Sequence, residues 1–112
     1  MEAKDLRIGN LVFIGKEVNV LELVDFVDIY ENNTIKHFEP IPLTEEWLLK
    51  FGFESYDGEY KYASRWLNIE KSENGYVKLA DDYFIDSFEF KHVHQLQNLY
   101  FALTNEELIL KQ

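Results

Sequence analysis

The sequence predicts an α+β fold in a single domain over residues 1–112, and three observations support that prediction. Short apolar segments separated by turn residues recur within 7–38 and again within 53–91, as in antiparallel sheets. Residues 45–51 and 93–104 instead place apolar side chains at helical spacing. A chain of 112 residues that is 46% apolar is long enough to form one hydrophobic core.

The first half of the chain is predicted to be β-structure. Four short segments are rich in Val, Ile, Leu and Phe, and they are Arg7–Ile14, Glu17–Leu23, Asp25–Tyr30 and Thr34–Phe38. Gly15-Lys16 suits a tight hairpin turn between the first two segments, because glycine adopts a positive φ without strain. Short strands at this spacing are typical of small barrels, so we expect an SH3-like barrel in this half.

A short helix is predicted over residues 45–51. Thr44 is a residue type that caps helix N-termini, and Glu45 and Glu46 place acids in the first turn, where the helix dipole stabilises negative charge. Gly52 follows the last apolar residue and can adopt the left-handed conformation that ends many helices.

An antiparallel meander is predicted for residues 53–91. Asp57-Gly58 and Asn74-Gly75 are the dipeptides most typical of two-residue hairpin turns, which need positive φ. We expect further turns at Asp81-Asp82 and Asp86-Ser87, and we expect the tail at 107–110 to return as an edge strand.

The C-terminal helix is predicted over 93–104 from an apolar stripe at helical spacing. The stripe consists of Val93, Leu96, Leu99, Tyr100 and Leu103. Because such a stripe has to be covered, we expect the helix to pack on the meander. Phe101 lies off the stripe with His94 and Gln97, so either the helix is buried on two sides or Phe101 contacts a partner. If the side that carries Gln97 is solvated, its change to alanine should be nearly neutral.

The composition excludes several classes of function. The 21 acidic and 11 basic residues give a net charge of −10, which disfavours direct nucleic-acid binding. Cysteine is absent, which excludes disulfides, thiolate metal sites and cysteine nucleophiles. The glycines are not clustered as in a phosphate-binding loop. No apolar run approaches the roughly 20 residues of a membrane span, and the start is charged, so we expect a cytoplasmic protein without membrane contact.

His92 and His94 are the candidate metal ligands. On a strand, residues two apart point to the same face, and Asp81, Asp82 or Asp86 could complete a site. The pair lies where a strand gives way to a helix, and that junction breaks the shared orientation. We therefore expect one buried and one solvated histidine, no metal and no other cofactor.

The sequence does not predict an enzyme. Glu45-Glu46 and Asp81-Asp82 are paired carboxylates, but the first pair fits a helix turn and the second fits a loop turn. The serines lack the Gly-x-Ser-x-Gly context of a nucleophile elbow. We therefore expect no catalytic residues.

Aromatic side chains are the remaining candidate site. A small antiparallel sheet buries only one face, so some aromatic residues of the second half are expected on the surface, where Tyr and Trp anchor protein interfaces. In the alternative they form the core and a cross-strand ladder. The candidate interface residues are Tyr56, Tyr60, Tyr62, Trp66, Tyr76 and Phe101.

Three segments resemble a group of small uncharacterised proteins from genomes, phages and mobile elements of the Bacteroides–Flavobacterium group. They are Asp5–Val12 (DLRIGNLV), Glu39–Phe53 (EPIPLTEEWLLKFGF) and Val93–Thr104 (VHQLQNLYFALT). The resemblance covers about a third of the chain. It implies a cytoplasmic accessory protein of bacterial or phage origin, and it assigns no catalytic or binding residue.

The leading hypothesis is a non-enzymatic, protein-binding accessory module of a phage or mobile element. Its acidity suits a partner protein with a basic surface, because opposite potentials speed association. One version is an acidic inhibitor of a host nucleic-acid-binding protein. Two alternatives stay open: a metal-dependent enzyme that uses His92 and His94, and a structural protein that assembles with its own copies into a homo-oligomer.

Overall fold

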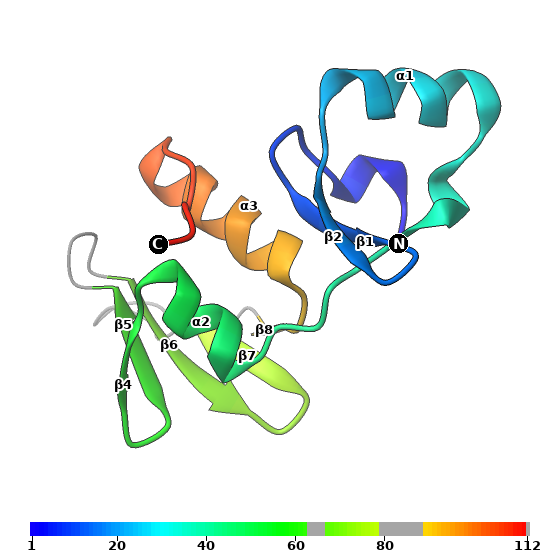
Figure 1. The fold of residues 1–112 in the computed structure, drawn as a ribbon. Coiled ribbons are helices and arrows are strands. Elements are labelled where there is room, and N and C mark those ends of the chain that lie inside the picture. Colours follow the sequence, from blue (N-terminus) through cyan, green and yellow to red (C-terminus); the bar gives the residue numbers. More distant parts are fainter. Residues whose placement is uncertain (63–66, 79–88, 112) are drawn as a thin grey trace.

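The computed structural model describes residues 1–62, 67–78 and 89–111, and Figure 1 shows their arrangement. These residues form a mixed α+β fold of three α-helices and two antiparallel sheets, which confirms the predicted class. Trp66 and the turns expected at Asp81-Asp82 and Asp86-Ser87 lie outside the described residues.

The N-terminal part consists of a short sheet and one α-helix. Its elements are η1 (Ala3–Asp5), β1 (Leu11–Ile14), β2 (Glu17–Val20), α1 (Leu23–Asn32), η2 (Ile35–His37) and β3 (Phe38–Glu39). The strands pair antiparallel in the order β2-β1-β3. Gly15, at φ +66°, and Lys16 form the predicted hairpin turn, since Ile14 pairs with Glu17 across it.

The prediction of a strand over Asp25–Tyr30 is wrong, because these residues belong to α1. Phe26 and Ile29 lie one turn apart on the helix and face a small core. The Asp25 carboxylate accepts a hydrogen bond from the Glu22 N–H at 2.8 Å, which caps the first turn. The burial of one helix face thus outweighs the strand preference of the Val, Ile, Phe and Tyr residues in this segment.

The structure does not contain the expected barrel. Within the described residues neither sheet closes on itself, and α1 occupies the place of the third predicted strand. Both strands of the first hairpin are also shorter than predicted, because β1 begins at Leu11 and β2 ends at Val20. Before β1 the chain turns, and the Asn10 N–H donates to the carbonyl of Arg7 at 3.0 Å.

Helix α2 (Glu45–Phe51) has the predicted bounds. The Thr44 hydroxyl accepts a hydrogen bond from the Trp47 N–H at 3.4 Å, which confirms the N-cap. Gly52 has φ +98°, and the Phe53 N–H donates back to the carbonyl of Leu48 at 3.0 Å, as in a Schellman motif. Local capping chemistry therefore sets both ends of this helix.

The second sheet is the predicted meander. Its strands are β4 (Glu54–Tyr56), β5 (Glu59–Tyr62), β6 (Leu67–Ser72), β7 (Gly75–Lys78) and β8 (Glu89–Phe90). They pair antiparallel in chain order. Asp57 and Gly58 form the first turn, both at positive φ, as predicted.

The hairpin between β6 and β7 turns one residue earlier than expected. Ser72 pairs with Gly75, so Glu73 and Asn74 occupy the turn and Gly75 begins the strand. A Cβ atom on Gly75 would lie 2.5 Å from the carbonyl oxygen of Phe90. This glycine is therefore required for the close approach of β8 and not for a turn conformation.

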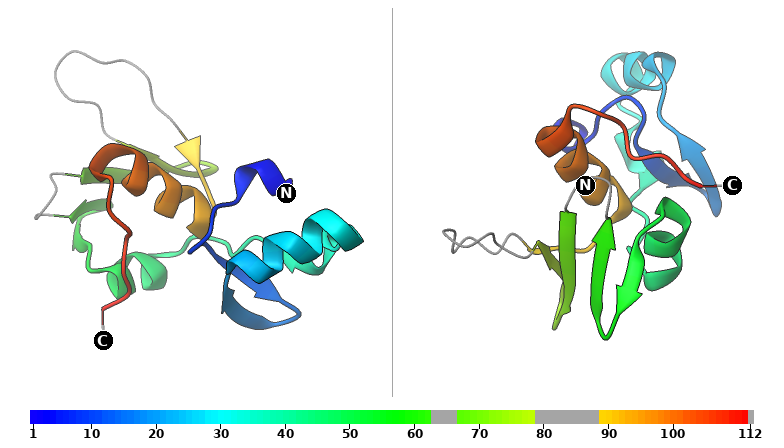
Figure 2. Two further views of the ribbon diagram at one scale, coloured as in Figure 1. Left: turned by 90° about the horizontal axis from the view of Figure 1, so that it is seen from above. Right: turned by 90° about the vertical axis from the view of Figure 1, so that its left-hand side faces the viewer.

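Helix α3 (Val93–Thr104) also has the predicted bounds, and it ends at Asn105 in the left-handed conformation, at φ +59°. It packs against the meander (Figures 1 and 2). Three stripe residues, Val93, Leu96 and Tyr100, are buried. Leu103 is 53% exposed, so the predicted stripe ends one turn early.

The tail at 107–110 is not the expected edge strand. It crosses the molecule, buries Leu108 in the main core, and lets the Lys111 N–H donate to the carbonyl of Lys50 at 2.7 Å (Figure 2). None of the described helices is long and apolar enough to cross a membrane.

Two clusters of buried side chains lie on opposite sides of β1. Leu11 belongs to the larger cluster with α2, α3 and the meander, whereas Val12 belongs to the smaller cluster under α1. Alternation along one strand thus supplies a side chain to each cluster. The segment 40–44, which links β3 to α2, contacts the start of α3, because the Val93 N–H donates to the carbonyl of Ile41 at 2.9 Å.

Candidate functional site

The two candidate metal ligands lie together at the start of α3. The rings of His92 and His94 are nearly parallel, with their centroids 5.7 Å apart. His94 is only 3% exposed, whereas His92 is half-buried. Burial lowers the pKa of His94 to about 4, and the neighbouring His92 adds to this effect. Burial likewise lowers the pKa of His92. Both rings are therefore neutral at pH 7.

These histidines line a cleft. It has a volume of about 640 Å³ and lies between η1, the segment after β3 and one face of α3. Its lining residues are Met1, Lys4, Asp5, Pro40, His92, His94, Gln95, Asn98, Leu99 and Ala102. Most of its polar groups already have partners, since Gln95 accepts from the Lys91 and His92 N–H groups. The Nδ1 atom of His94 has no hydrogen-bond partner among the described residues.

The chemistry of this cleft is limited. The described residues contain no group of three or more His, Asp or Glu side chains that could hold a metal ion. Asp81, Asp82 and Asp86 lie outside the described residues. Within the described part, no carboxylate reaches either imidazole at ion-pair distance, so the cleft brings together no acid–base pair.

Two of the aromatic candidates are buried. Tyr60 and Tyr76 pack edge to face with ring centroids 6.0 Å apart, and both belong to the main core. Tyr62 packs edge to face on Tyr100 at 5.4 Å and tilted on Phe53 at 5.0 Å. These three side chains therefore fit the alternative interpretation, since Tyr60 and Tyr76 pack on each other and Tyr62 packs on Tyr100 of α3.

Two other aromatic candidates reach the surface. Tyr56 is 51% exposed at the outer strand β4, and its hydroxyl donates to the Glu54 carboxylate at 2.5 Å. Phe101 is half-buried, with the Arg7 guanidinium carbon 4.3 Å from its ring centroid. Trp66 lies outside the described residues.

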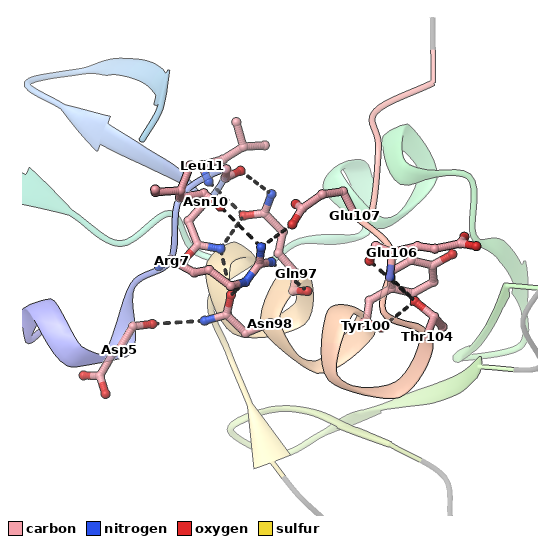
Figure 3. A network of polar contacts seen from close by, with 12 residues as sticks. Asp5, Arg7, Asn10, Leu11, Gln97, Asn98, Tyr100, Thr104, Glu106 and Glu107 are labelled. Carbon is pink, nitrogen blue, oxygen red and sulfur yellow. Dashed lines mark hydrogen bonds and ion pairs between the residues drawn. The ribbon is translucent and has the colours of Figure 1, made fainter. Parts of the chain in front are cut away.

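A buried polar network on α3 was not predicted from the sequence. The Gln97 side chain is 2% exposed, and its Oε1 accepts a hydrogen bond from the Leu11 N–H at 2.8 Å. Its Nε2 donates to the carbonyl of Gly9 at 3.1 Å. This side of α3 is therefore not solvated, and the condition under which Gln97→Ala would be nearly neutral is not met. The helix is buried on two sides, because Gln97 takes the place of a strand partner for the chain before β1 (Figure 3).

Neighbouring residues extend this network to both ends of the chain. Asn98 Oδ1 accepts from Asn10 Nδ2 at 2.8 Å and from Arg7 Nε at 3.2 Å (Figure 3). Arg7 also forms an ion pair with Glu107 in the tail. The network therefore joins the N-terminal part, α3 and the tail, and its role is structural.

Among the described residues, a group of strongly exposed apolar side chains lies on α1, most of which was predicted to be a strand. Leu23 and Val24 are each 66% exposed, Val27 is 45% exposed and Tyr30 is 90% exposed. Leu23, Val27 and Tyr30 are spaced i, i+4 and i+7, so they form one ridge along the helix. We call Leu23, Val24, Val27 and Tyr30 together the α1 ridge. Figure 1 places α1 at the outer end of the molecule, away from the meander.

An apolar groove adjoins the α1 ridge. It has a volume of about 420 Å³ and lies between α1 and η1. Its lining residues are Ala3, Phe26, Val27, Ile29, Tyr30 and Glu31. Val27 and Tyr30 thus belong to both the ridge and the groove, and Glu31 is the only charged residue in the lining.

The charged side chains of the segment that contains the α1 ridge are all acidic, and Lys16 and Lys36 flank this segment. Residues 17–35 contain five acids, Glu17, Glu22, Asp25, Asp28 and Glu31, and no Lys or Arg. No ion pair within the described residues involves any of these acids. Hydrogen bonds from Asn32 and Thr34 lower the pKa of Asp28, so this carboxylate stays charged well below pH 7. The surface is therefore apolar and negatively charged at the same time.

Sequence reasoning missed this surface because it treated residues 25–30 as a strand. The available signal was the spacing of Phe26 and Ile29, which matches one buried helix face and leaves Leu23, Val27 and Tyr30 exposed beside it. Comparison with protein-family models, curated proteins and solved structures finds no match to this chain.

Proposed function

We propose that the chain is a non-enzymatic, protein-binding accessory module that acts in the cytoplasm on a protein with a basic surface. One observation carries this proposal: the α1 ridge exposes four large apolar side chains within a segment that contains five acids and no base. Exposed apolar patches with a polar rim mark interaction sites, because solvating them costs free energy that a partner recovers.

The sign of the charge selects the class of partner. Acids without an internal ion pair favour a cationic surface, and the attraction acts before contact and raises the association rate. A basic groove that binds nucleic acid has this character. Inhibition of a host nucleic-acid-binding protein is the form of the proposal that we favour, and the net charge of −10, the small size and the resemblance together support it.

Charge-reversal variants test the proposal. Glu17→Lys/Glu31→Lys changes two exposed acids of the 17–35 segment, and Glu70→Lys/Glu73→Lys makes the same change in net charge on exposed acids of the β6–β7 hairpin. Proteins retained from a lysate of the encoding organism would be identified with both variants and the unmodified chain. The protein that is retained most strongly would then be purified, and its binding to the chain would be titrated at low and at high salt.

We expect the unmodified chain to bind a basic protein with an affinity that falls as salt rises. Glu17→Lys/Glu31→Lys should weaken this binding by about tenfold or more, and Glu70→Lys/Glu73→Lys should change it by less than about threefold. Equal losses in both variants, or no retained protein, would contradict the proposal. Sedimentation tests the self-assembly alternative. If the unmodified chain forms a dimer with itself and Glu17→Lys/Glu31→Lys does not, self-assembly replaces the proposed binding to a basic protein.

A further inference from the structure

The geometry of the α1 ridge specifies the partner further, and this inference rests on the proposed function. We infer that the partner presents an amphipathic basic helix, which packs along the α1 ridge and inserts one apolar side chain into the groove between α1 and η1. The lining of the groove and the spacing of the ridge carry this inference.

A helix fits the ridge better than an extended peptide does. Leu23, Val27 and Tyr30 run along α1 at i, i+4 and i+7, and ridges of this kind interlock with the grooves of a second helix. An extended peptide is bound through the free backbone groups of a sheet edge. The backbone of α1 is already hydrogen-bonded within the helix, so the ridge offers side chains alone.

The groove supplies an anchoring position. Its volume of about 420 Å³ lies within the roughly 300–1,000 Å³ range of known binding pockets, and five of its six lining residues are Ala, Phe, Val, Ile or Tyr. Glu31 at its rim can pair with a Lys or Arg that lies one turn from the inserted side chain. Tyr30, at 90% exposure, is of the residue type that most often dominates binding energy.

Charge argues against a second copy of the chain as the occupant. In a symmetric dimer the two α1 ridges would face each other with their acids, and like charges in close opposition destabilise an interface. A basic helix from another protein removes this repulsion and neutralises the acids of the 17–35 segment.

A designed peptide tests the inference on the full chain. The probe is a fluorescein-labelled 15-residue peptide of Leu and Lys that forms an amphipathic helix. The first control has the same composition in a scrambled order that presents no apolar face. Binding would be measured by fluorescence anisotropy at physiological salt, and the contact site by chemical-shift changes of the backbone amides.

We expect the helical peptide to bind at least about tenfold more tightly than the scrambled peptide, with shift changes confined to α1 and η1. Val27→Ala/Tyr30→Ala should weaken binding by about tenfold or more. Leu49→Ala/Leu103→Ala removes two apolar side chains, 48% and 53% exposed, from α2 and α3, and it should leave the affinity within about twofold.

Three results would overturn the inference: equal binding of both peptides, shift changes centred outside α1 and η1, or an unchanged affinity in Val27→Ala/Tyr30→Ala. The proposed function would survive these results if Glu17→Lys/Glu31→Lys still lost its basic protein partner. It would fail separately if the unmodified chain bound no basic protein in a salt-dependent way. The two failures are therefore distinguishable.

Discussion

His94 shows how the packing of one residue makes the stability of the molecule depend on pH. Its ring is buried at the start of α3, and the Nδ1 atom has no hydrogen-bond partner among the described residues. Burial and the adjacent His92 disfavour the charged ring, and the attraction of Asp5 opposes them only in part. The folded chain therefore holds His94 neutral to lower pH than the unfolded chain does.

The expected consequence is a loss of stability on acidification. With a folded pKa of about 4 against 6.5 in the unfolded chain, the unfolded state binds the extra proton between these values. The stability that the neutral His94 ring contributes is present in full above about pH 6.5. As pH falls to about 4, the free energy of unfolding should drop by about 3 kcal/mol from this group.

Urea unfolding at pH 7 and pH 5 measures this effect. In His94→Gln the difference between the two pH values should be smaller than in the unmodified chain, because the titrating group is gone. His37→Gln serves as the control, since His37 is exposed. Equal pH differences in the unmodified chain and in His94→Gln would show that His94 does not titrate as inferred.

At the scale of secondary-structure elements, α3 is the helix on which both parts of the molecule depend. One side buries Val93, Leu96 and Tyr100 against the meander and α2, and the other side places Gln97 against the chain before β1. Helix α1 is different, because it buries one face and exposes the other. The first pattern is that of a structural helix, and the second leaves apolar side chains on the surface, where we propose that a partner binds.

Leu96→Ala tests the structural role of α3. Leu96 is fully buried in the main core, so removing its side chain should lower the free energy of unfolding by about 2–5 kcal/mol. Leu103→Ala, on the exposed last turn, should change it by no more than about 0.5 kcal/mol. Both would be measured by denaturant unfolding at one protein concentration. Unchanged stability in Leu96→Ala together with lost partner binding would mean that the stripe is an interface.

At the scale of the whole molecule, the network around Gln97 and Asn98 joins the two clusters of buried side chains. It ties the turn before β1 to α3, and Arg7 adds the tail through Glu107 (Figure 3). Helix α1, which carries the ridge, lies at the end of the molecule away from α3 (Figure 1). We expect the network to hold the part that carries the ridge on the rest of the fold.

Gln97→Ala should therefore destabilise the chain, contrary to the expectation for a solvated position. The substitution leaves the buried Leu11 N–H without its acceptor, and an unsatisfied buried donor costs about 1–3 kcal/mol. Denaturant unfolding measures the loss, and hydrogen exchange locates it. Protection should fall in β1 and β2 before it falls in the meander. A uniform fall in protection would indicate that the two clusters unfold together. Unchanged stability and protection would contradict a structural role for Gln97.

Local signals in the sequence determined α2, α3 and the meander. The Thr44 cap, the Gly52 and Asn105 stops and the Asp57-Gly58 turn act within a few residues, so they can be read without knowledge of the fold. The turn at Asn74-Gly75 shifted by one residue because the neighbouring strand, not the turn, fixes the glycine. The resemblance and the partner class inferred from the sequence stay predictions.

Long-range contacts decided the rest. Leu11 and Gln97 are 86 residues apart, and only the packing of α3 beside β1 reveals that the Gln97 amide completes the hydrogen bonds of the chain there. Segment 25–30 has residues that suit a strand or a helix, and the position of Phe26 and Ile29 over the small core selected the helix. That choice exposes the α1 ridge. Binding surfaces are what burial leaves uncovered, and burial is settled only by the tertiary structure.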